Sequence, residues 1–166
     1  MSAIISPCGK YRTRLDRQVM HNSGPTYAFF GINPSTADAS IDDATVRKWT
    51  EFVRQWGGRQ FLVANVFSYR ATDVKELDRQ NRLHTPLFGP THWDDIYSII
   101  AEADVLIPCW GNSVKVNHNI RPCIAELLRV LQSCGKPVKC FGRNDSSGDP
   151  KHPLFLPYTT ELVGWE

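Results

Sequence analysis

Short apolar runs alternate with amphipathic segments along this chain, and that alternation restricts its fold more than any single motif does. Four runs are typical of buried strands, and they span residues 26–32, 61–66, 105–110 and 138–141. Between them, apolar residues recur at helical spacing, which predicts helices beginning near residues 42, 94 and 122. Strands separated by helices imply a parallel sheet that is covered on both faces. We therefore expect an α/β fold of three layers, α/β/α, around a central, mainly parallel four-stranded sheet, in one domain over residues 1–166.

Three further segments complete this expectation. Residues 11–17 have the character of an initial strand, and the sequence His-Asn-Ser-Gly-Pro at residues 21–25 predicts a turn after it. Two long connections, residues 67–91 and 143–158, do not fit the alternation, although a short helix is expected around residues 74–79. Long loops in compact domains usually carry function, so both connections are candidates for part of a site.

Composition excludes several classes of protein. Charged residues make up 22% and hydrophobic residues 42% of the chain, which argues against disorder, and no apolar run approaches the roughly 20 residues that a membrane helix needs. The first ten residues lack the apolar core of a signal peptide, so we expect a cytoplasmic protein with no membrane partner. A net charge of +2 does not require a nucleic-acid partner, although it leaves room for a local basic patch.

Cysteine and histidine usage predicts reduced thiols and no cofactor. The five cysteines are odd in number and form no CxxC pair, as expected for a chain in a reducing compartment. The histidines stand at no ligand spacing with each other or with a cysteine, so no metal is expected.

The motif Gly31-Ile32-Asn33-Pro34 ends the first buried strand abruptly. Glycine lets the backbone turn or approach a ligand closely, and Pro34 fixes φ and has no N–H to donate. Asn33 then stands at the carboxyl end of a strand, where open α/β sheets bind ligands. Its amide offers one acceptor and two donors, enough to hold a water or the edge of a base. A plain strand-ending turn is the alternative interpretation.

Polar side chains follow all four predicted strands. Asn65 ends the second strand, Asn112 follows the third, and Arg143 and His152 come after the fourth. Because parallel strands bring their carboxyl ends to one edge of a sheet, these side chains are expected to converge there with Asn33. Each residue also has an ordinary structural alternative: Asn65 as a loop cap, Trp110 as core, and His152 as a surface loop residue.

From residue 26 to about residue 158, the chain resembles the uracil-DNA glycosylase superfamily. The resemblance lies in the order of four motifs: Phe-Gly-Ile-Asn-Pro at residues 30–34, Phe-Leu-Val-Ala-Asn at 61–65, the apolar strand ending in Trp-Gly at 106–111, and His-Pro-Leu at 152–154. It implies cleavage of an N-glycosidic bond, in which Asn33 places a water, Asn65 reads the base edge and His152 stabilises the departing base. It also implies that an aromatic ring stacks on the base, and the candidates are Phe30, Tyr69 and Trp110.

A closer resemblance is to a small, often phage-encoded family, the domain of unknown function 1643. Its pattern matches Asn-Pro-Ser-Thr-Ala-Asp at residues 33–38, Asp-Asp-Ala-Thr-Val-Arg at 42–47 and Asn-Val-Phe-Ser-Tyr-Arg-Ala-Thr-Asp at 65–73. This resemblance identifies a family without implying an activity.

Three departures from the glycosylase pattern bear on the expected chemistry. Asn33 stands where a carboxylate would serve as general base, so one of the following acids, Asp38, Asp42 or Asp43, is expected to take that role, although helix capping is the alternative for Asp42 and Asp43. Arg47 and Arg70, with Lys151 or Arg143, are suited to a phosphate, although both arginines could simply pair with nearby acids. The final loop lacks a Ser-Pro-Ser run, which argues against insertion into a duplex.

The sequence therefore predicts a glycosylase-like hydrolase acting on a nucleotide or a nucleic-acid base, with DNA favoured over RNA and a modified base of phage DNA included. The alternative is a non-catalytic nucleotide or nucleic-acid binder with the same pocket. The candidate catalytic residues are Asn33, Asp42, Asp43 and His152. The candidate substrate-binding residues are Phe30, Gly31, Ser35, Thr36, Arg47, Asn65, Tyr69, Arg70, Trp110, Asn112 and Arg143.

Overall fold

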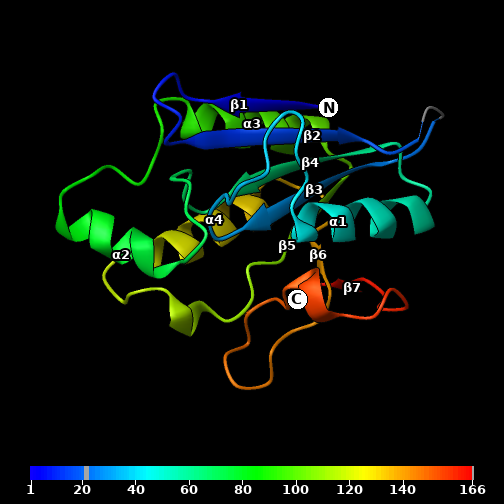
Figure 1. Cartoon of the computed structure of the whole chain (residues 1–166). Helices are drawn as coiled ribbons and strands as arrows, with labels where there is room; N and C mark the ends of the chain where they lie inside the picture. Colours follow the sequence, from blue (N-terminus) through cyan, green and yellow to red (C-terminus); the bar gives the residue numbers. More distant parts are fainter. Residues whose placement is uncertain (21–22, 166) are drawn as a thin grey trace.

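A five-stranded mixed sheet forms the centre of the molecule (Figure 1). The computed structural model describes residues 1–20 and 23–165. The sheet contains β1 (Ser2–Ile5), β2 (Arg12–Gln18), β3 (Thr26–Gly31), β4 (Gln60–Asn65) and β5 (Val105–Pro108), in the order β1-β2-β4-β3-β5. The helices are α1 (Ala44–Gln55), α2 (Lys75–Arg82), α3 (His92–Glu102) and α4 (Pro122–Ser133), with short 3₁₀ turns η1 (Ser113–Lys115) and η2 (Pro153–Phe155).

The α/β class is confirmed, and the parallel arrangement expected of the central strands holds for β3, β4 and β5, but the sheet has five strands and its β1–β2 edge is antiparallel. β3 pairs in parallel with β4 and β5, whereas β2 pairs antiparallel with β4 and β1 antiparallel with β2. The chain reverses between β2 and β3 within eight positions, from residue 18 to residue 26, which is too short for the crossover that parallel strands need.

The strand predicted at residues 138–141 is only partly formed. β6 (Lys139–Cys140) pairs antiparallel with β7 (Val163–Gly164) in a separate two-stranded sheet. A single parallel bridge from Val138 to Leu106 links this segment to β5. The ladder therefore stops after one residue, and the chain leaves the main sheet on its way to the segment that contains His152.

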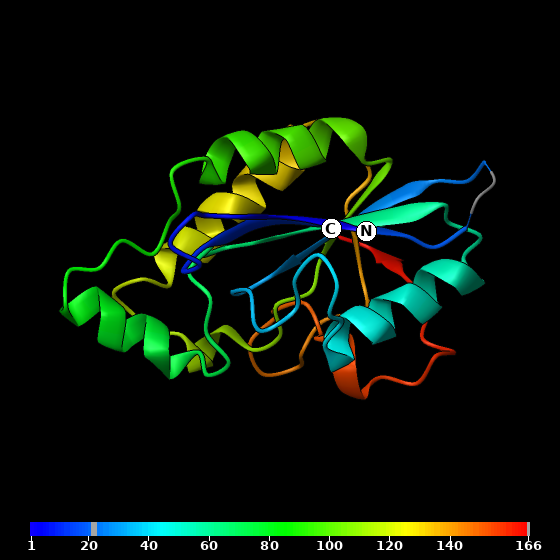
Figure 2. The ribbon, with the colours of Figure 1, turned by 45° about the horizontal axis from the view of Figure 1, so that its top comes forward.

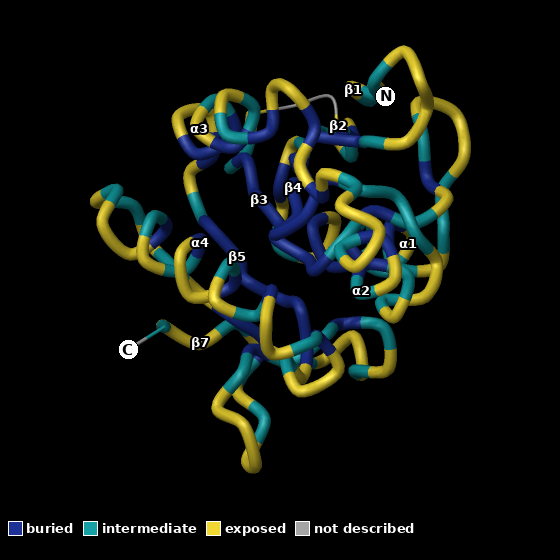
Figure 3. Tube along the Cα trace, turned by 90° about the vertical axis from the view of Figure 1, so that its left-hand side faces the viewer, coloured by how far each residue is buried: buried dark blue, intermediate teal, exposed yellow. Residues whose placement is uncertain are grey.

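Helices cover the sheet on both faces, with α3 and α4 on one side and α1 on the other (Figure 2). Alternate residues of β3 serve the two faces: Ala28 and Phe30 pack toward α3 and α4, and Phe29 packs toward α1, where its ring stacks on Trp49 at a centroid distance of 5.0 Å. β3 is buried throughout and β4 is buried after its first residue (Figure 3), as expected for strands covered on both faces.

Residues at its two ends determine where α1, the helix that borders the site, begins and stops. Asp43 is the N-cap of α1, and its Oδ1 accepts a hydrogen bond from the Val46 N–H at 2.9 Å. The helix ends before Gly57, whose φ is +69°. The predicted start of this helix is therefore confirmed, whereas the turn predicted at residues 21–25 includes residues 21 and 22, which lie outside the described residues. Among the residues described, no helix is both long and apolar enough to cross a membrane.

Candidate functional site

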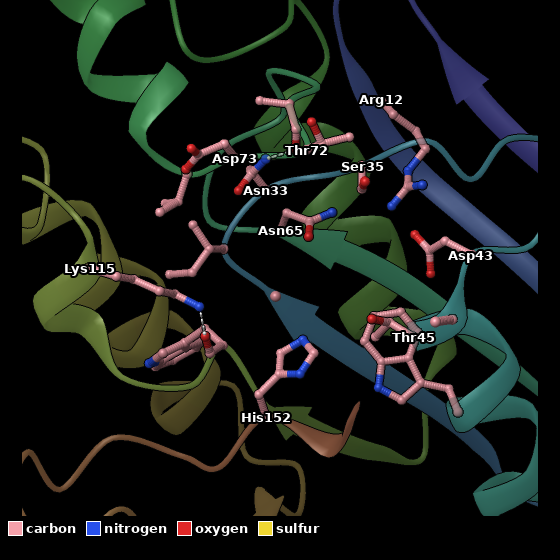
Figure 4. A pocket seen from close by; sticks show the side chains of 17 residues that line it. Arg12, Asn33, Ser35, Asp43, Thr45, Asn65, Thr72, Asp73, Lys115 and His152 are labelled. Atoms are coloured by element: carbon pink, nitrogen blue, oxygen red, sulfur yellow. Dashed lines mark hydrogen bonds between the residues drawn. The ribbon is translucent and has the colours of Figure 1, made fainter. Parts of the chain in front are cut away.

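A cavity of about 550 Å³ lies at the carboxyl ends of β3 and β4 (Figure 4). Its walls come from the end of β3 and the loop after it, the start of α1, the loop after β4, and the segments around residues 110–115 and 152. The polar side chains that line it are Arg12, Asn33, Ser35, Asp43, Thr45, Asn65, Thr72, Asp73, Lys115 and His152. Residues distant in sequence thus meet at the sheet edge where α/β proteins bind ligands.

Asn33 is oriented by the loop that follows β4. Its Nδ2 donates to the carbonyl of Ala71 at 2.7 Å and to that of Pro34 at 3.2 Å. The amide hydrogens are therefore directed at the protein, and the carbonyl oxygen of the side chain is the group left to serve a ligand. An oxygen held in this way can accept a hydrogen bond from a water and fix its position.

Asn65 and Gly31 are neighbours across the β3–β4 pair. Asn65 is 5% exposed, and its amide has no hydrogen-bond partner among the residues that the structure describes. A Cβ on Gly31 would lie 2.9 Å from Asn65 Oδ1, so the absence of a side chain at residue 31 leaves room for this amide. A buried amide whose donors and acceptor face a cavity is suited to reading a polar ligand edge.

The adjacent acids Asp42 and Asp43 occupy different environments. Asp43 lines the cavity, while one of its oxygens caps α1. Asp42 lies outside the cavity and forms an ion pair with Arg17 at 2.7 Å, where Arg17 is 2% exposed. Asp38 accepts hydrogen bonds from the N–H groups of Ser40 and Ile41 and closes a turn. Among the three acids named from the sequence, Asp43 alone is placed to act on a ligand in this cavity.

His152 presents a hydrogen-bond donor to the cavity. Its Nδ1 accepts from the N–H of Leu154 at 3.3 Å, so in the neutral ring the proton is on Nε2. Burial, reinforced by the positive charge of Lys115, lowers the pKa of His152 to about 4, although Asp43 partly offsets this effect. The imidazole is therefore neutral at pH 7. Gly111, at φ +75°, lies against it, and a Cβ there would be 3.2 Å from the Cβ of His152.

Two cationic side chains that the sequence did not indicate, Lys115 and Arg12, border the cavity. Lys115 Nζ donates to the carbonyl of Trp110 at 2.9 Å, and burial lowers the pKa of this amine. Arg12 is 3% exposed, donates from Nη1 to the carbonyl of Ala37 at 2.7 Å, and has its pKa lowered by burial to about 10, so it remains charged at pH 7. In Figure 4, Arg12 and Asp43 lie at one side of the cavity and Lys115 at the other, with Asn65 between them.

Of the aromatic residues named from the sequence as stacking candidates, only Trp110 lines this cavity. Phe30 is fully buried in the core that the sheet forms with α3 and α4, and Tyr69 packs edge-on against Tyr11. Trp49, on the buried side of α1, is 5% exposed and also lines the cavity.

The structure places the remaining candidates at other positions. Thr36, Tyr69 and Arg70 line a neighbouring depression of about 470 Å³ with Cys8, and Asn112 lines another of about 500 Å³ with Lys151. Arg47 donates to the carbonyl of Asp42 at 2.6 Å. Arg143 stacks on the ring of Trp165 at 4.1 Å. The four residues of the predicted phosphate site, Arg47, Arg70, Arg143 and Lys151, therefore do not line the cavity at the ends of β3 and β4.

Six polar or aromatic residues of the cavity were not predicted: Arg12, Thr45, Trp49, Thr72, Asp73 and Lys115. Thr45, Thr72 and Asp73 lie within the motifs at residues 42–47 and 65–73, so inspection of every polar position in those motifs would have found them. Arg12 and Lys115 lie outside every motif. Arg12 belongs to the initial strand, which was not placed in the predicted sheet, and Lys115 belongs to a 3₁₀ turn.

The family comparison agrees with the motifs. A family model described as "Protein of unknown function (DUF1643)" matches residues 12–154, which is most of the 166-residue chain. No curated protein and no solved structure matches the chain. The match begins at Arg12 and ends just after His152, so the matched region contains every residue that lines the cavity. The chain belongs to the DUF1643 family.

Proposed function

We propose that this protein hydrolyses the N-glycosidic bond of a nucleotide or of a base in nucleic acid, using the cavity at the ends of β3 and β4. The observation that carries the proposal is that Asn33, Asp43, Asn65 and His152 line one cavity and offer different hydrogen-bonding capacities there. Each capacity corresponds to a separate need of the reaction. The order of the motifs also supports assignment of the fold to the uracil-DNA glycosylase superfamily.

The reaction needs a water placed and activated at the anomeric carbon. The side-chain oxygen of Asn33 orients that water, and the carboxylate of Asp43 takes its proton as the new C–O bond forms. A fixed amide and a fixed carboxylate reduce the entropy lost in bringing the water to the sugar.

The reaction also needs stabilisation of the departing base. As the C–N bond breaks, its electron pair moves onto the base nitrogen, and negative charge develops on the ring. The Nε2–H of neutral His152 donates to that ring, and the ammonium of Lys115 adds a positive charge nearby. Asn65 holds the base edge, and Trp110 and Trp49 supply apolar walls. The base leaves as an anion and takes up one proton, equivalent to the one that Asp43 accepted from the water, and the sugar carries the hydroxyl of the water.

A mass-spectrometric screen for released free base tests the proposal. Purified protein is incubated with ribonucleotides, deoxynucleotides and DNA containing uracil, mismatched or modified bases, and Asn33→Ala is run beside it. Release by the wild type that is lost in Asn33→Ala supports the hydrolase. Tight binding of a nucleotide without release of any base supports instead a non-catalytic nucleotide-binding protein.

A further inference from the structure

The guanidinium of Arg12 is the most deeply buried charge at the cavity. Arg12 is 3% exposed, and among the described residues its Nε has no hydrogen-bond partner and no carboxylate lies within ion-pair distance of it. Its only hydrogen bond there is the one to the Ala37 carbonyl. Burial lowers the pKa of Arg12 even though the carboxylates of Asp43 and Asp38 lie near enough to raise it, so the cost of burial exceeds what these charges offset. An anion that binds directly to the guanidinium would supply a further compensating charge.

The first turn of α1 adds donors beside Arg12. Ala44 and Thr45 both line the cavity, and their backbone N–H groups open a helix of 12 residues. Asp43 satisfies the N–H of Val46, but the N–H groups of Ala44 and Thr45 have no partner in the described part of the chain. Unpaired N–H groups at a helix N-terminus attract anions, and phosphate groups are common there. The hydroxyls of Ser35 and Thr45 also line this cavity.

We propose that Arg12, the first turn of α1 and Ser35 bind a phosphate group of the substrate. This inference rests on the proposed nucleotide hydrolase and specifies its substrate class: a nucleotide that carries its phosphate, in place of a bare nucleoside. The phosphate lies at the Arg12 side of the cavity. The base lies toward His152 and Lys115, with Asn65 between the two ends (Figure 4).

Asp43 opposes the phosphate, because its carboxylate lies at the same side of the cavity. Binding must therefore come from directed hydrogen bonds of Arg12 and the helix N–H groups more than from net charge. Asp43→Asn should tighten phosphate binding, because asparagine keeps the capping oxygen and removes the negative charge. An increase in affinity is a result that a folding defect does not produce.

Titrations of nucleotide and nucleoside pairs test the subsite. The common deoxynucleoside 5′-monophosphates and their matching nucleosides are titrated against the wild type, with the fluorescence of Trp49 and Trp110 as the signal and inorganic phosphate as competitor. We expect the best nucleotide to bind about tenfold or more tightly than its nucleoside. Arg12→Gln should remove that difference while leaving nucleoside affinity within about threefold. Arg14→Gln is the matched control, since Arg14 pairs with Asp16 and Glu102 away from the cavity.

The possible outcomes distinguish failure of the proposed phosphate subsite from failure of the proposed hydrolase activity. Equal binding of nucleotide and nucleoside by the wild type, or a preference that survives in Arg12→Gln, overturns the subsite even if base release is found. If Arg12→Gln does not fold by circular dichroism, an unchanged or weakened nucleotide affinity in Asp43→Asn overturns it. A preference lost in Arg12→Gln, without base release from any substrate, retains the subsite and rejects the hydrolase. A short single-stranded oligonucleotide, titrated beside the mononucleotides, shows whether the phosphate belongs to a free nucleotide or to a strand.

Discussion

At the scale of single residues, Asp42 and Asp43 show how neighbouring carboxylates come to serve different purposes. Asp42 neutralises Arg17, which is almost fully buried, whereas Asp43 caps α1 and lines the cavity. Sequence alone left the two acids equivalent, because both precede the helix and both have the residue type of an N-cap. Only the position of β2, which carries Arg17, distinguishes them.

Replacing each acid by its amide should separate these two roles. Asp43→Asn should lower base release by about 10²-fold or more, since it removes the proton acceptor, and should leave stability nearly unchanged because asparagine is also a good N-cap. Asp42→Asn should leave the rate per folded molecule unchanged and lower the free energy of unfolding by about 1–3 kcal/mol, because Arg17 loses its ionic partner. Turnover and urea unfolding of both variants check this. Equal loss of turnover in the two variants would contradict it.

At the scale of elements, the end of β3 and the end of β4 form the floor of the cavity together. The parallel register places Gly31 beside Asn65, and the missing side chain at residue 31 accommodates the amide. The sequence indicated this pair because each residue ends a strongly apolar run. It did not indicate Arg12, because β2 is antiparallel to β4 and therefore presents its amino end, not its carboxyl end, at this edge of the sheet.

Gly31→Ala should displace the Asn65 side chain. The added Cβ would lie 2.9 Å from Asn65 Oδ1, so we expect at least a tenfold loss of nucleotide affinity and a destabilisation of about 1–3 kcal/mol from overpacking. Gly164→Ala is the control, since a Cβ there meets nothing within 4 Å among the described residues. Unchanged affinity in a correctly folded Gly31→Ala would show that Asn65 does not contact the ligand.

At the scale of the whole molecule, the amphipathic pattern was enough to predict the α/β class, the helices and the parallel central strands, but it did not predict the antiparallel β1–β2 edge. The hydrophobic pattern indicates which residues are buried, and β3, β4 and β5 are largely buried, as their apolar runs predict. Direction depends on the length of the connections. The short link between residues 18 and 26 excludes a β2 parallel to β3, so the antiparallel edge of the sheet could have been deduced from the sequence. Lys115 and His152 both reach the cavity because of the paths of two irregular loops, and no residue pattern in the sequence specifies those paths.

Lowering the pH from 6.5 to about 4 should decrease the free energy of unfolding of the protein. Burial lowers the pKa of both His92 and His152 to about 4, below the ordinary value of 6.5 that applies in the unfolded chain. The unfolded state therefore binds more protons in this window, so stability is fully present above pH 6.5 and is lost as the pH falls. The loss should be roughly 1–3 kcal/mol for each histidine.

Urea unfolding at several pH values checks this expectation. The double variant His92→Gln, His152→Gln should have a nearly flat stability profile between pH 4 and 6.5. Glu102→Gln is the control, because Arg14 lowers the pKa of that carboxyl to about 2 and its contribution is lost only below pH 4.5. A wild-type profile that is already flat from pH 4 to 6.5 would contradict the neutral, buried state of His152.

The most direct test of the proposed hydrolase is single-turnover release of free base by the wild type and by Asn33→Ala, with binding of the same nucleotide measured in parallel. The Asn33 oxygen acts mainly in the transition state, so the variant should bind within about threefold of the wild type and release base about 10²-fold or more slowly. Asn65→Ala should instead lose both affinity and rate, because it holds the base before the reaction begins. Equal rates in the wild type and Asn33→Ala, or nucleotide binding by the wild type with no base released, would contradict the proposal.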